Sequence, residues 1–462
     1  MEQPLLGKKS LFSIKAKKEG LNFFQLALPM FFTQLALQLV QVNSVIQSGN
    51  YSSDVLAGIL LAGNLWFPIF IGLGGIIFFV TPMVAQLYGA KRIEETGYIV
   101  RQAMWLCIPI VALGMLILSQ GPKILELAKV DQEIIFHADE YLSYFIFALP
   151  AILLSQPLRS LSEGITKPIP ITIANLIMLL IAIFCNYAFI YGNFGFPEMG
   201  AKGAGLSAII STWTAFTGLS IYFGIAKIYK PTNLFSNLEL PDSKTVKEIM
   251  KGGLPIGFGN FIELSMFSGA GILLGRLGSD VIAAHGIALN IGGLLFMVPL
   301  AVGNAAAVRV GNNIGSGNPI AAKYSSYFSM RLAVLLGMIN SLLLILFSEV
   351  LISNIYTSQS EVISLAVILL YFAAFFQVAD GLIMGGVGSL RGYKYTFVPM
   401  LIMAFSYWAI GMPIGIGLSI TNIFGEPIGA IGMWIGMSAG LSVAAVLIVY
   451  RVRVISKEFI NG

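Results

Sequence analysis

Charged side chains are scarce in this sequence. Asp, Glu, Lys and Arg together make up 11% of its 462 residues, whereas the hydrophobic class makes up 57%. A soluble protein carries about 25% charged residues, which cover its surface. The shortage excludes a water-soluble globular protein of this length. The composition instead predicts an integral membrane protein whose surface mostly faces lipid.

Cysteine and histidine are scarce as well, with two residues of each. Zinc fingers, iron–sulfur clusters and disulfide frameworks are therefore excluded. An enzyme embedded in a membrane would need a cluster of His, Asp or Ser near one membrane face. His137 and His285 instead fall in different halves of the chain. We therefore expect a protein that is not an enzyme and that carries no cofactor.

The apolar residues gather in long runs, each of which can cross a hydrocarbon core of about 30 Å as a helix. Twelve such runs are present: 21–48, 56–84, 98–119, 138–158, 168–191, 202–226, 250–275, 281–308, 324–347, 363–388, 396–419 and 427–450. The sequence thus predicts an all-α integral membrane protein with twelve transmembrane helices.

The basic residues indicate which side of the membrane each loop faces. Of the 27 Lys and Arg residues, all but Lys123, Lys129, Lys202 and Arg276 fall in loops, span ends or tails on one side. Cytoplasmic loops carry such an excess. Both termini are therefore predicted to lie in the cytoplasm, and the compact loops favour a bacterial inner membrane. Positive charge spread in this way does not indicate nucleic-acid binding, and we expect a monomer surrounded by membrane lipid.

The two halves of the chain match without gaps at a constant offset of 226 positions. This offset places Leu28-Pro29 on Leu254-Pro255 and Ser53-Asp54-Val55 on Ser279-Asp280-Val281. One offset held over a long stretch indicates an internal duplication. The paired prolines are either bending points for conformational change or static kinks, because proline removes a backbone hydrogen bond from a helix.

The duplication predicts how the helices are grouped. Since one repeat contains six spans, an even number, both halves have the same orientation in the membrane. The expected architecture is two six-helix lobes related by a pseudo-two-fold axis along the membrane normal. We expect an N-lobe at 1–226, a cytoplasmic linker at 227–249 and a C-lobe at 250–462. A substrate cavity between two such lobes is the usual arrangement.

Two acidic residues lie well inside predicted spans. Glu263 stands in span 7, about 20 Å from the start of its helix, and Asp380 stands in span 10, about 12 Å from the inner end of its helix. A carboxylate at membrane depth costs at least about 2.5–3.5 kcal/mol on insertion scales, so it is expected to have a function. Both acids belong to the second half, and the repeat places the apolar Leu37 where Glu263 stands.

We interpret Glu263 and Asp380 as one site that binds Na⁺ or H⁺. A hard cation prefers several oxygen ligands, and backbone carbonyls and the Ser265 hydroxyl could add to the two carboxylates. Two carboxylates that share a dry site repel each other, which makes a proton an effective competitor for Na⁺. The alternative is that each acid is satisfied separately and only packs helices together.

Further polar residues are candidates to line a cavity. Gln34, Gln38 and Gln41 share one face of the first span, since they are four and three positions apart. Asn43 lies near the outer end of the same span, and His285 lies near the outer start of span 8. Helix packing is an alternative role for the glutamines, and a hydrogen bond to a neighbour is an alternative to titration for His285.

Three stretches after even-numbered spans resemble motifs of multidrug and toxic compound extrusion (MATE) transporters. They are Gln86–Ala90 after span 2, Val308–Pro319 after span 8 and Gly388–Gly392 after span 10. The resemblance covers nearly the whole chain. It implies a V-shaped pair of bundles with a central cavity. It also implies a secondary active antiporter that exports cationic or amphipathic organic compounds in exchange for Na⁺ or H⁺, by alternating access.

The resemblance also bears on the site. Glu263 and Asp380 are similar to the coupling pair of the NorM-like and eukaryotic-like branches. The DinF-like branch relies on an Asp in the first span, where this chain has Asn43, which cannot titrate. The alternative function is a flippase for lipid-linked precursors on a related two-lobe scaffold. Such substrates are anionic, and no Lys or Arg stands in the middle of a span to receive them.

Overall fold

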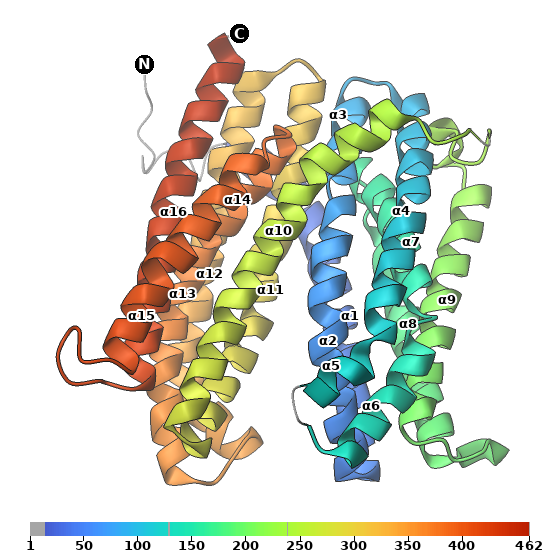
Figure 1. Ribbon diagram of the computed structural model, residues 1–462. Helices are drawn as coiled ribbons and strands as arrows, with labels where there is room; N and C mark the ends of the chain where they lie inside the picture. The colour runs from blue at the N-terminus through green and yellow to red at the C-terminus, as the bar shows by residue number, and fades with distance from the viewer. Residues whose placement is uncertain (1–13, 128–129, 238, 462) are drawn as a thin grey trace. The chain divides into compact units, whose positions relative to one another are not determined.

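The structure, a computed structural model, describes residues 14–127, 130–237 and 239–461. Every regular element within these ranges is a helix (Figure 1). Its longer helices are α1 (Ile14–Tyr51), α2 (Ser53–Ile77), α3 (Val80–Gly89), α4 (Thr96–Ser119), α5 (Gly121–Leu127), α6 (Gln132–Phe145), α7 (Leu149–Gly164), α8 (Ile169–Tyr191), α9 (Ala201–Ile225), α10 (Ser243–Leu274), α11 (Ser279–Gly315), α12 (Pro319–Ile355), α13 (Ser360–Gly392), α14 (Phe397–Ala404), α15 (Met412–Ser419) and α16 (Ala430–Asn461).

These helices confirm the all-α membrane fold. In the described ranges, eleven helical segments are long and apolar enough to cross a membrane, and the bent pair α6 and α7 brings the number to twelve. This pair corresponds to the predicted fourth span, which is broken by a 49° bend rather than straight. Pro150 stands at the start of α7. Proline fits the first turn of a helix but cannot donate a backbone hydrogen bond within one, so a new helix begins there.

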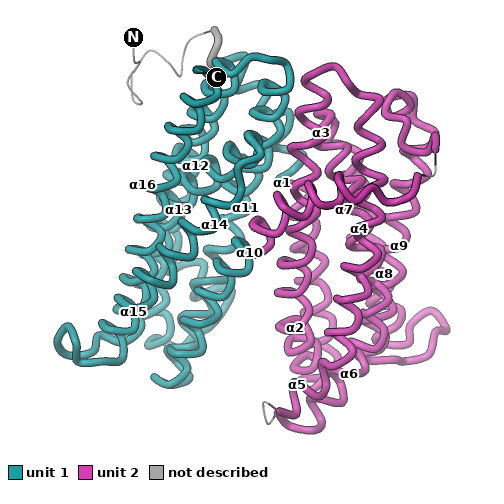
Figure 2. The backbone as a smooth tube through the Cα atoms, turned by 45° about the horizontal axis from the view of Figure 1, so that its top comes forward, with its two compact units in different colours: residues 1–31, 258–462 teal, residues 32–257 magenta. Residues whose placement is uncertain are grey.

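The chain forms two compact units, and their boundaries follow the repeat. Unit 1 comprises residues 1–31 and 258–462, and unit 2 comprises residues 32–257 (Figure 2). The two boundaries, after Phe31 and after Gly257, are separated by the predicted repeat offset. Pro29 and Pro255 each stand two positions before a boundary. The predicted lobes at 1–226 and 250–462 divide the chain by its repeat rather than by its contacts, and they stay a prediction.

The first turns of α1 are attached to unit 1 by an ion pair. Arg309 of α11 donates two hydrogen bonds to the Glu19 carboxylate, Nε to Oε1 at 3.2 Å and Nη2 to Oε2 at 2.7 Å. The Ser325 hydroxyl of α12 also donates to Glu19 Oε1, at 2.5 Å. Glu19 is buried. Because a buried carboxylate must be paired or hydrogen-bonded, these contacts fix where α1 begins.

The first turn of α10 is attached to unit 2 by hydrogen bonds rather than by an ion pair. Asp242, just before α10, accepts hydrogen bonds from the Thr245 hydroxyl at 2.7 Å and the Tyr98 hydroxyl at 3.1 Å. Its backbone N–H donates to Gln102 Oε1 at 2.6 Å. The hydrogen bonds from Thr245 lower the pKa of Asp242 to about 2. This residue therefore acts as an N-terminal cap of α10 that is ionised at neutral pH.

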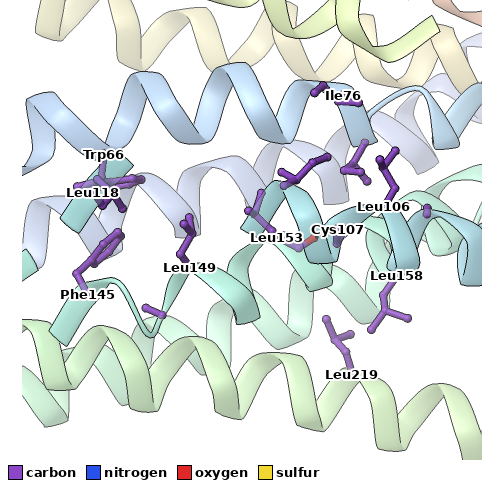
Figure 3. Packing of buried hydrophobic residues seen from close by; sticks show 14 of the residues in the cluster. Trp66, Ile76, Leu106, Cys107, Leu118, Phe145, Leu149, Leu153, Leu158 and Leu219 are labelled. Atoms are coloured by element: carbon purple, nitrogen blue, oxygen red, sulfur yellow. Dashed lines mark hydrogen bonds between the residues drawn. The ribbon is translucent and has the colours of Figure 1, made fainter. Parts of the chain in front are cut away.

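The interior of unit 2 is apolar and closely packed (Figure 3). The rings of Trp66 in α2 and Phe145 in α6 lie with centroids 4.7 Å apart, and Leu149 and Leu153 of α7 continue the same cluster. Cys107 is fully buried in this cluster, and its thiol donates a weak hydrogen bond to the Leu153 carbonyl at 3.6 Å. Such packing holds the helices of unit 2 in place.

Candidate functional site

The two acids predicted as an ion site come together in unit 1. Glu263 lies in the second half of α10, and Asp380 lies in α13. Asp380 is 6% exposed, whereas Glu263 is only partly buried. The charge of Glu263 acts on Asp380, so the two carboxylates share one region of the unit. Residues 117 positions apart in the sequence thus form an acidic pair at membrane depth.

Neither acid is neutralised by a direct contact. Within the described ranges, no hydrogen bond to either carboxylate and no ion pair with a basic group is found. An ionised carboxylate in an apolar interior without a partner is costly. The pair therefore has unused capacity for a cation. Two carboxylates with neighbouring oxygens form a donor set that suits a hard monovalent ion or a proton.

A tyrosine that the sequence analysis missed lies beside the acids. Tyr407 is fully buried, and the charges of both Glu263 and Asp380 act on it. Its hydroxyl has no hydrogen-bond partner in the described part of the chain. A buried tyrosine hydroxyl normally has such a partner, so this one can offer an oxygen to a guest. The signal in the sequence was a hydroxyl near the middle of the apolar run at 396–419.

Local backbone geometry places this tyrosine. Residues Phe405–Gly411 form a π-helix, η5, between α14 and α15. A π-helix inserts extra residue length into a helix and rotates the side chains that follow it, and such elements are frequent at functional sites. Neither the composition nor the periodicity of this run distinguishes it from an ordinary α-helix. The orientation of Tyr407 therefore could not be predicted.

Ser265, predicted as an additional ligand, already has two partners. Its hydroxyl donates to the Ile262 carbonyl at 2.8 Å and accepts from the Trp408 indole Nε1 at 3.1 Å. A hydroxyl has one proton and two lone pairs. One lone pair therefore stays available for a cation. As Ser265 lies two positions from Glu263 on α10, its proposed role as a ligand stays a prediction.

An arginine of the same unit also lies near Glu263. Arg391, in the last turn of α13, donates from Nη2 to Oδ1 of Asn260 at 3.3 Å. Asn260 precedes Glu263 by three positions on α10, so the two share a helix face. The charges of Arg391 and Glu263 act on each other, although they form no ion pair in the described ranges. The sequence analysis did not include Arg391 in the site.

His285 lies in a separate aromatic cluster of unit 1. It is buried, and its Nδ1 accepts a hydrogen bond from the Trp434 indole at 3.1 Å. Trp434 also stacks on Phe376, with ring centroids 5.2 Å apart and planes at 6°. Because an indole N–H can only donate, Nδ1 must be unprotonated in this arrangement. The structure thus supports the alternative of a histidine hydrogen-bonded to a neighbour.

The polar residues predicted on the first span lie in unit 2, not with the acidic pair. Gln34 accepts a hydrogen bond through Oε1 from Nη1 of Arg159 in α7, at 3.1 Å. Asn43 accepts through Oδ1 from Nε2 of Gln47 at 2.7 Å. Gln38 is partly buried. These contacts fit the helix-packing interpretation for Gln34, and a cavity-lining role for Gln34, Gln38 and Asn43 stays a prediction.

No cluster of three or more His, Cys, Asp or Glu residues that could hold a metal ion occurs in the described ranges. A site at Glu263 and Asp380 would therefore rely on hydroxyl and carbonyl oxygens for its remaining ligands. Such a sparse set of charged ligands suits a monovalent ion better than a divalent one.

The chain matches a protein family in two separate segments. The family model described as MatE matches residues 29–188 and 255–416. The two matches begin at Pro29 and Pro255, which the repeat offset relates to each other. This spacing confirms the internal duplication and its offset.

Curated relatives match over nearly their full length. The chain is 36% identical over 449 residues to the multidrug resistance protein PmpM of Pseudomonas aeruginosa. The aligned residues cover 97% of this chain and 94% of that protein. It is 33% identical over 431 residues to the probable multidrug resistance protein NorM of Idiomarina loihiensis, with 93% of each chain covered. This similarity is consistent with the NorM-like branch.

Solved structures share the fold at lower sequence identity. The crystal structure of the eukaryotic MATE transporter AtDTX14 has a TM-score of 0.86 and 20% identity, and covers 96% of this chain and 98% of that chain. The crystal structure of the Vibrio cholerae MATE transporter VcmN in the bent form has a TM-score of 0.83 and 16% identity, with 96% and 98% covered. At these identities the likeness establishes the fold alone.

Proposed function

Because the chain belongs to the MatE family, we propose that it is a secondary active multidrug efflux antiporter. It exports cationic and amphipathic organic compounds in exchange for Na⁺ or H⁺. The observation that carries this proposal is the acidic pair of Glu263 and Asp380, at membrane depth and without a neutralising contact in the described ranges. The names of the relatives support the class of substrate.

The exchange follows from competition for one negative site. In the outward-open state the coupling cation engages Glu263 and Asp380 and releases the organic cation. With its charge neutralised, the carrier changes access and opens to the cytoplasm. There the cation leaves, and the restored carboxylates attract the next organic cation. The coupling cation and the organic cation never need to touch each other, because each binds the two carboxylates only when the other has left.

The energy available is sufficient for multidrug export. One positive charge that moves inward through 100 mV releases about 2.3 kcal/mol, and a tenfold concentration gradient adds about 1.4 kcal/mol. For an uncharged compound, these together support a gradient of about a few hundredfold per coupling ion. The exchange of one monocation for another moves no net charge, so it supports a gradient of about tenfold.

The cellular setting extends the same proposal. The protein is a multi-pass integral membrane protein. We place it in a bacterial inner membrane with both termini in the cytoplasm, as a monomer that needs no cofactor and catalyses no chemical reaction. The flippase alternative loses support, because the partly buried Arg159 is neutralised by Glu163 and is not available for an anionic lipid.

The test is transport by purified protein in liposomes loaded with ethidium. An inward Na⁺ gradient and an inward H⁺ gradient are imposed separately, and one of them is expected to drive ethidium export. Glu263→Gln and Asp380→Asn are expected to abolish the driven export while the protein stays folded and inserted. Glu361→Gln is the control, because Glu361 is an exposed acid on the same helix as Asp380. Normal export by both site variants would refute the proposal.

A further inference from the structure

Each half has a partly buried arginine that donates a hydrogen bond to a side-chain amide. In unit 2, Arg159 donates to the side-chain oxygen of Gln34, and in unit 1, Arg391 donates to the side-chain oxygen of Asn260. Gln34 and Asn260 occupy equivalent positions, because the repeat offset places one on the other. Each arginine belongs to the fourth span of its own half, on α7 or on α13. The offset does not relate the two arginines to each other, so the two halves share the position of the amide and the type of contact, but not the position of the arginine.

The two arginines differ in how their charge is balanced. Arg159 pairs with Glu163, one turn later on the same helix, with Nε and Oε1 2.7 Å apart. Glu163 is 4% exposed and Arg159 is partly buried, so the two charges lie largely away from water and cancel each other. In unit 1 the residue one turn after Arg391 is Tyr395, which carries no negative charge. The acid whose charge acts on Arg391 is Glu263.

Asn260 keeps Arg391 close to the acidic pair. The hydrogen bond holds the guanidinium against α10, three positions before Glu263. Other arginines on helices packed against α13 have different partners: Arg309 of α11 pairs with Glu19, and Arg451 of α16 donates to the Tyr395 hydroxyl. A guanidinium stays charged at every physiological pH.

We propose that Arg391, held by Asn260, is a positioning residue that supplies the fixed counter-charge of the acidic pair. With both carboxylates ionised, the group of Arg391, Glu263 and Asp380 carries one net negative charge. A single monovalent cation, either the coupling ion or an organic substrate, therefore neutralises it. The site selects monocations over dications for the same reason. This inference rests on the proposed antiport function.

The substitution that tests the inference with the least change of shape is Asn260→Asp. It gives Arg391 an acidic partner, as Glu163 gives Arg159, and raises the net charge of the site to two negative charges. The purified variant is expected to bind the coupling cation, measured in the absence of ethidium, about tenfold or more tightly, because the added charge strengthens cation binding. Its affinity for the dication propidium is expected to rise relative to that for the monocation ethidium by about fivefold or more.

Matched variants separate charge from structure. Gln359→Glu adds the same charge at an exposed position directly before α13 and is expected to leave both cation measurements unchanged. Arg391→Gln removes the counter-charge and is expected to act like Asn260→Asp, whereas Arg391→Lys keeps the charge and is expected to restore wild-type behaviour. A purely structural loss would weaken cation binding, so the sign of the change is diagnostic.

Two failures can be told apart. If wild-type protein shows no cation-driven ethidium export, the proposed function is wrong. If wild-type protein exports ethidium, but folded Asn260→Asp and Arg391→Gln bind the coupling cation no more tightly, the role of Arg391 is wrong and the antiporter remains. An equal gain of cation affinity in Gln359→Glu would also overturn the inference.

Discussion

The two units keep the same scaffold but use buried charge in different ways. In unit 2, Arg159 pairs with Glu163 of the same helix, so the two charges cancel there. Unit 1 leaves Glu263 and Asp380 without a direct partner in the described ranges and sets an arginine nearby. Duplication produced two copies of the helix arrangement. Under the proposed function, the charges of unit 2 serve stability and those of unit 1 serve binding.

The largest effect is expected when the ion pair of Arg159 and Glu163 in unit 2 is broken. Glu163→Gln leaves the charge of Arg159 buried without its partner. Breaking such a pair costs about 3–5 kcal/mol of unfolding free energy. We therefore expect a marked fall in thermal unfolding temperature in detergent, whereas Asp380→Asn should not lower it, because the Asp380 carboxylate has no protein partner to lose in the described ranges.

The opposite result would contradict the difference between the two units. If Asp380→Asn destabilises the protein as much as Glu163→Gln does, the acid of unit 1 is also a structural group. The double variant Arg159→Met, Glu163→Leu is a control, and it is expected to be less destabilised than Glu163→Gln, since it leaves no unpaired charge.

A smaller effect is expected at the attachment of α1. Glu19→Gln loses the ion pair with Arg309 and weakens the hydrogen bond from Ser325. The expected cost is about 1–3 kcal/mol, because the Arg309 side chain is partly exposed and can be solvated. Amide hydrogen exchange in residues 17–27 measures the loosening. Unchanged exchange there would show that other contacts hold the start of α1.

The smallest effect concerns the corresponding attachment of α10. The pKa of Asp242 lies at about 2, below its ordinary value of about 3.9. A lowered pKa means that the stabilising contacts are complete above pH 4 and are lost as the pH falls through about 2. The protection factors for amide hydrogen exchange at the start of α10, which exclude the intrinsic pH dependence of exchange, should therefore differ little between pH 7 and pH 5. Asp242→Asn should exchange faster than wild type at both pH values, and equal protection would contradict the cap.

Much of the fold followed from the sequence. A polypeptide that crosses lipid must satisfy its backbone hydrogen bonds internally, so apolar runs of this length predict helices. The prediction was weakest where a run holds a break, as at Pro150 between α6 and α7. A run of apolar residues has the same composition whether its helix is straight, bent or locally a π-helix, so η5 also went unpredicted.

The candidate site was predicted only in part. Glu263 and Asp380 stood out because acids at membrane depth are rare. Arg391 stands near a span end, where arginines usually extend to the membrane surface, and Tyr407 has the composition of an ordinary core aromatic. Their importance depends on which helices pack together, which the order of residues along the chain does not state.

The sequence by itself determined the membrane-spanning helices, the duplication and the two buried acids. Each of these depends on the cost of placing polar groups in lipid, which acts on every residue according to its own chemistry. Only the tertiary structure decided that the starts of α1 and α10 join units 1 and 2 respectively, and that Asn260 holds Arg391 near Glu263. Those outcomes depend on contacts between segments far apart in the chain, and such contacts exist only once the helices have packed.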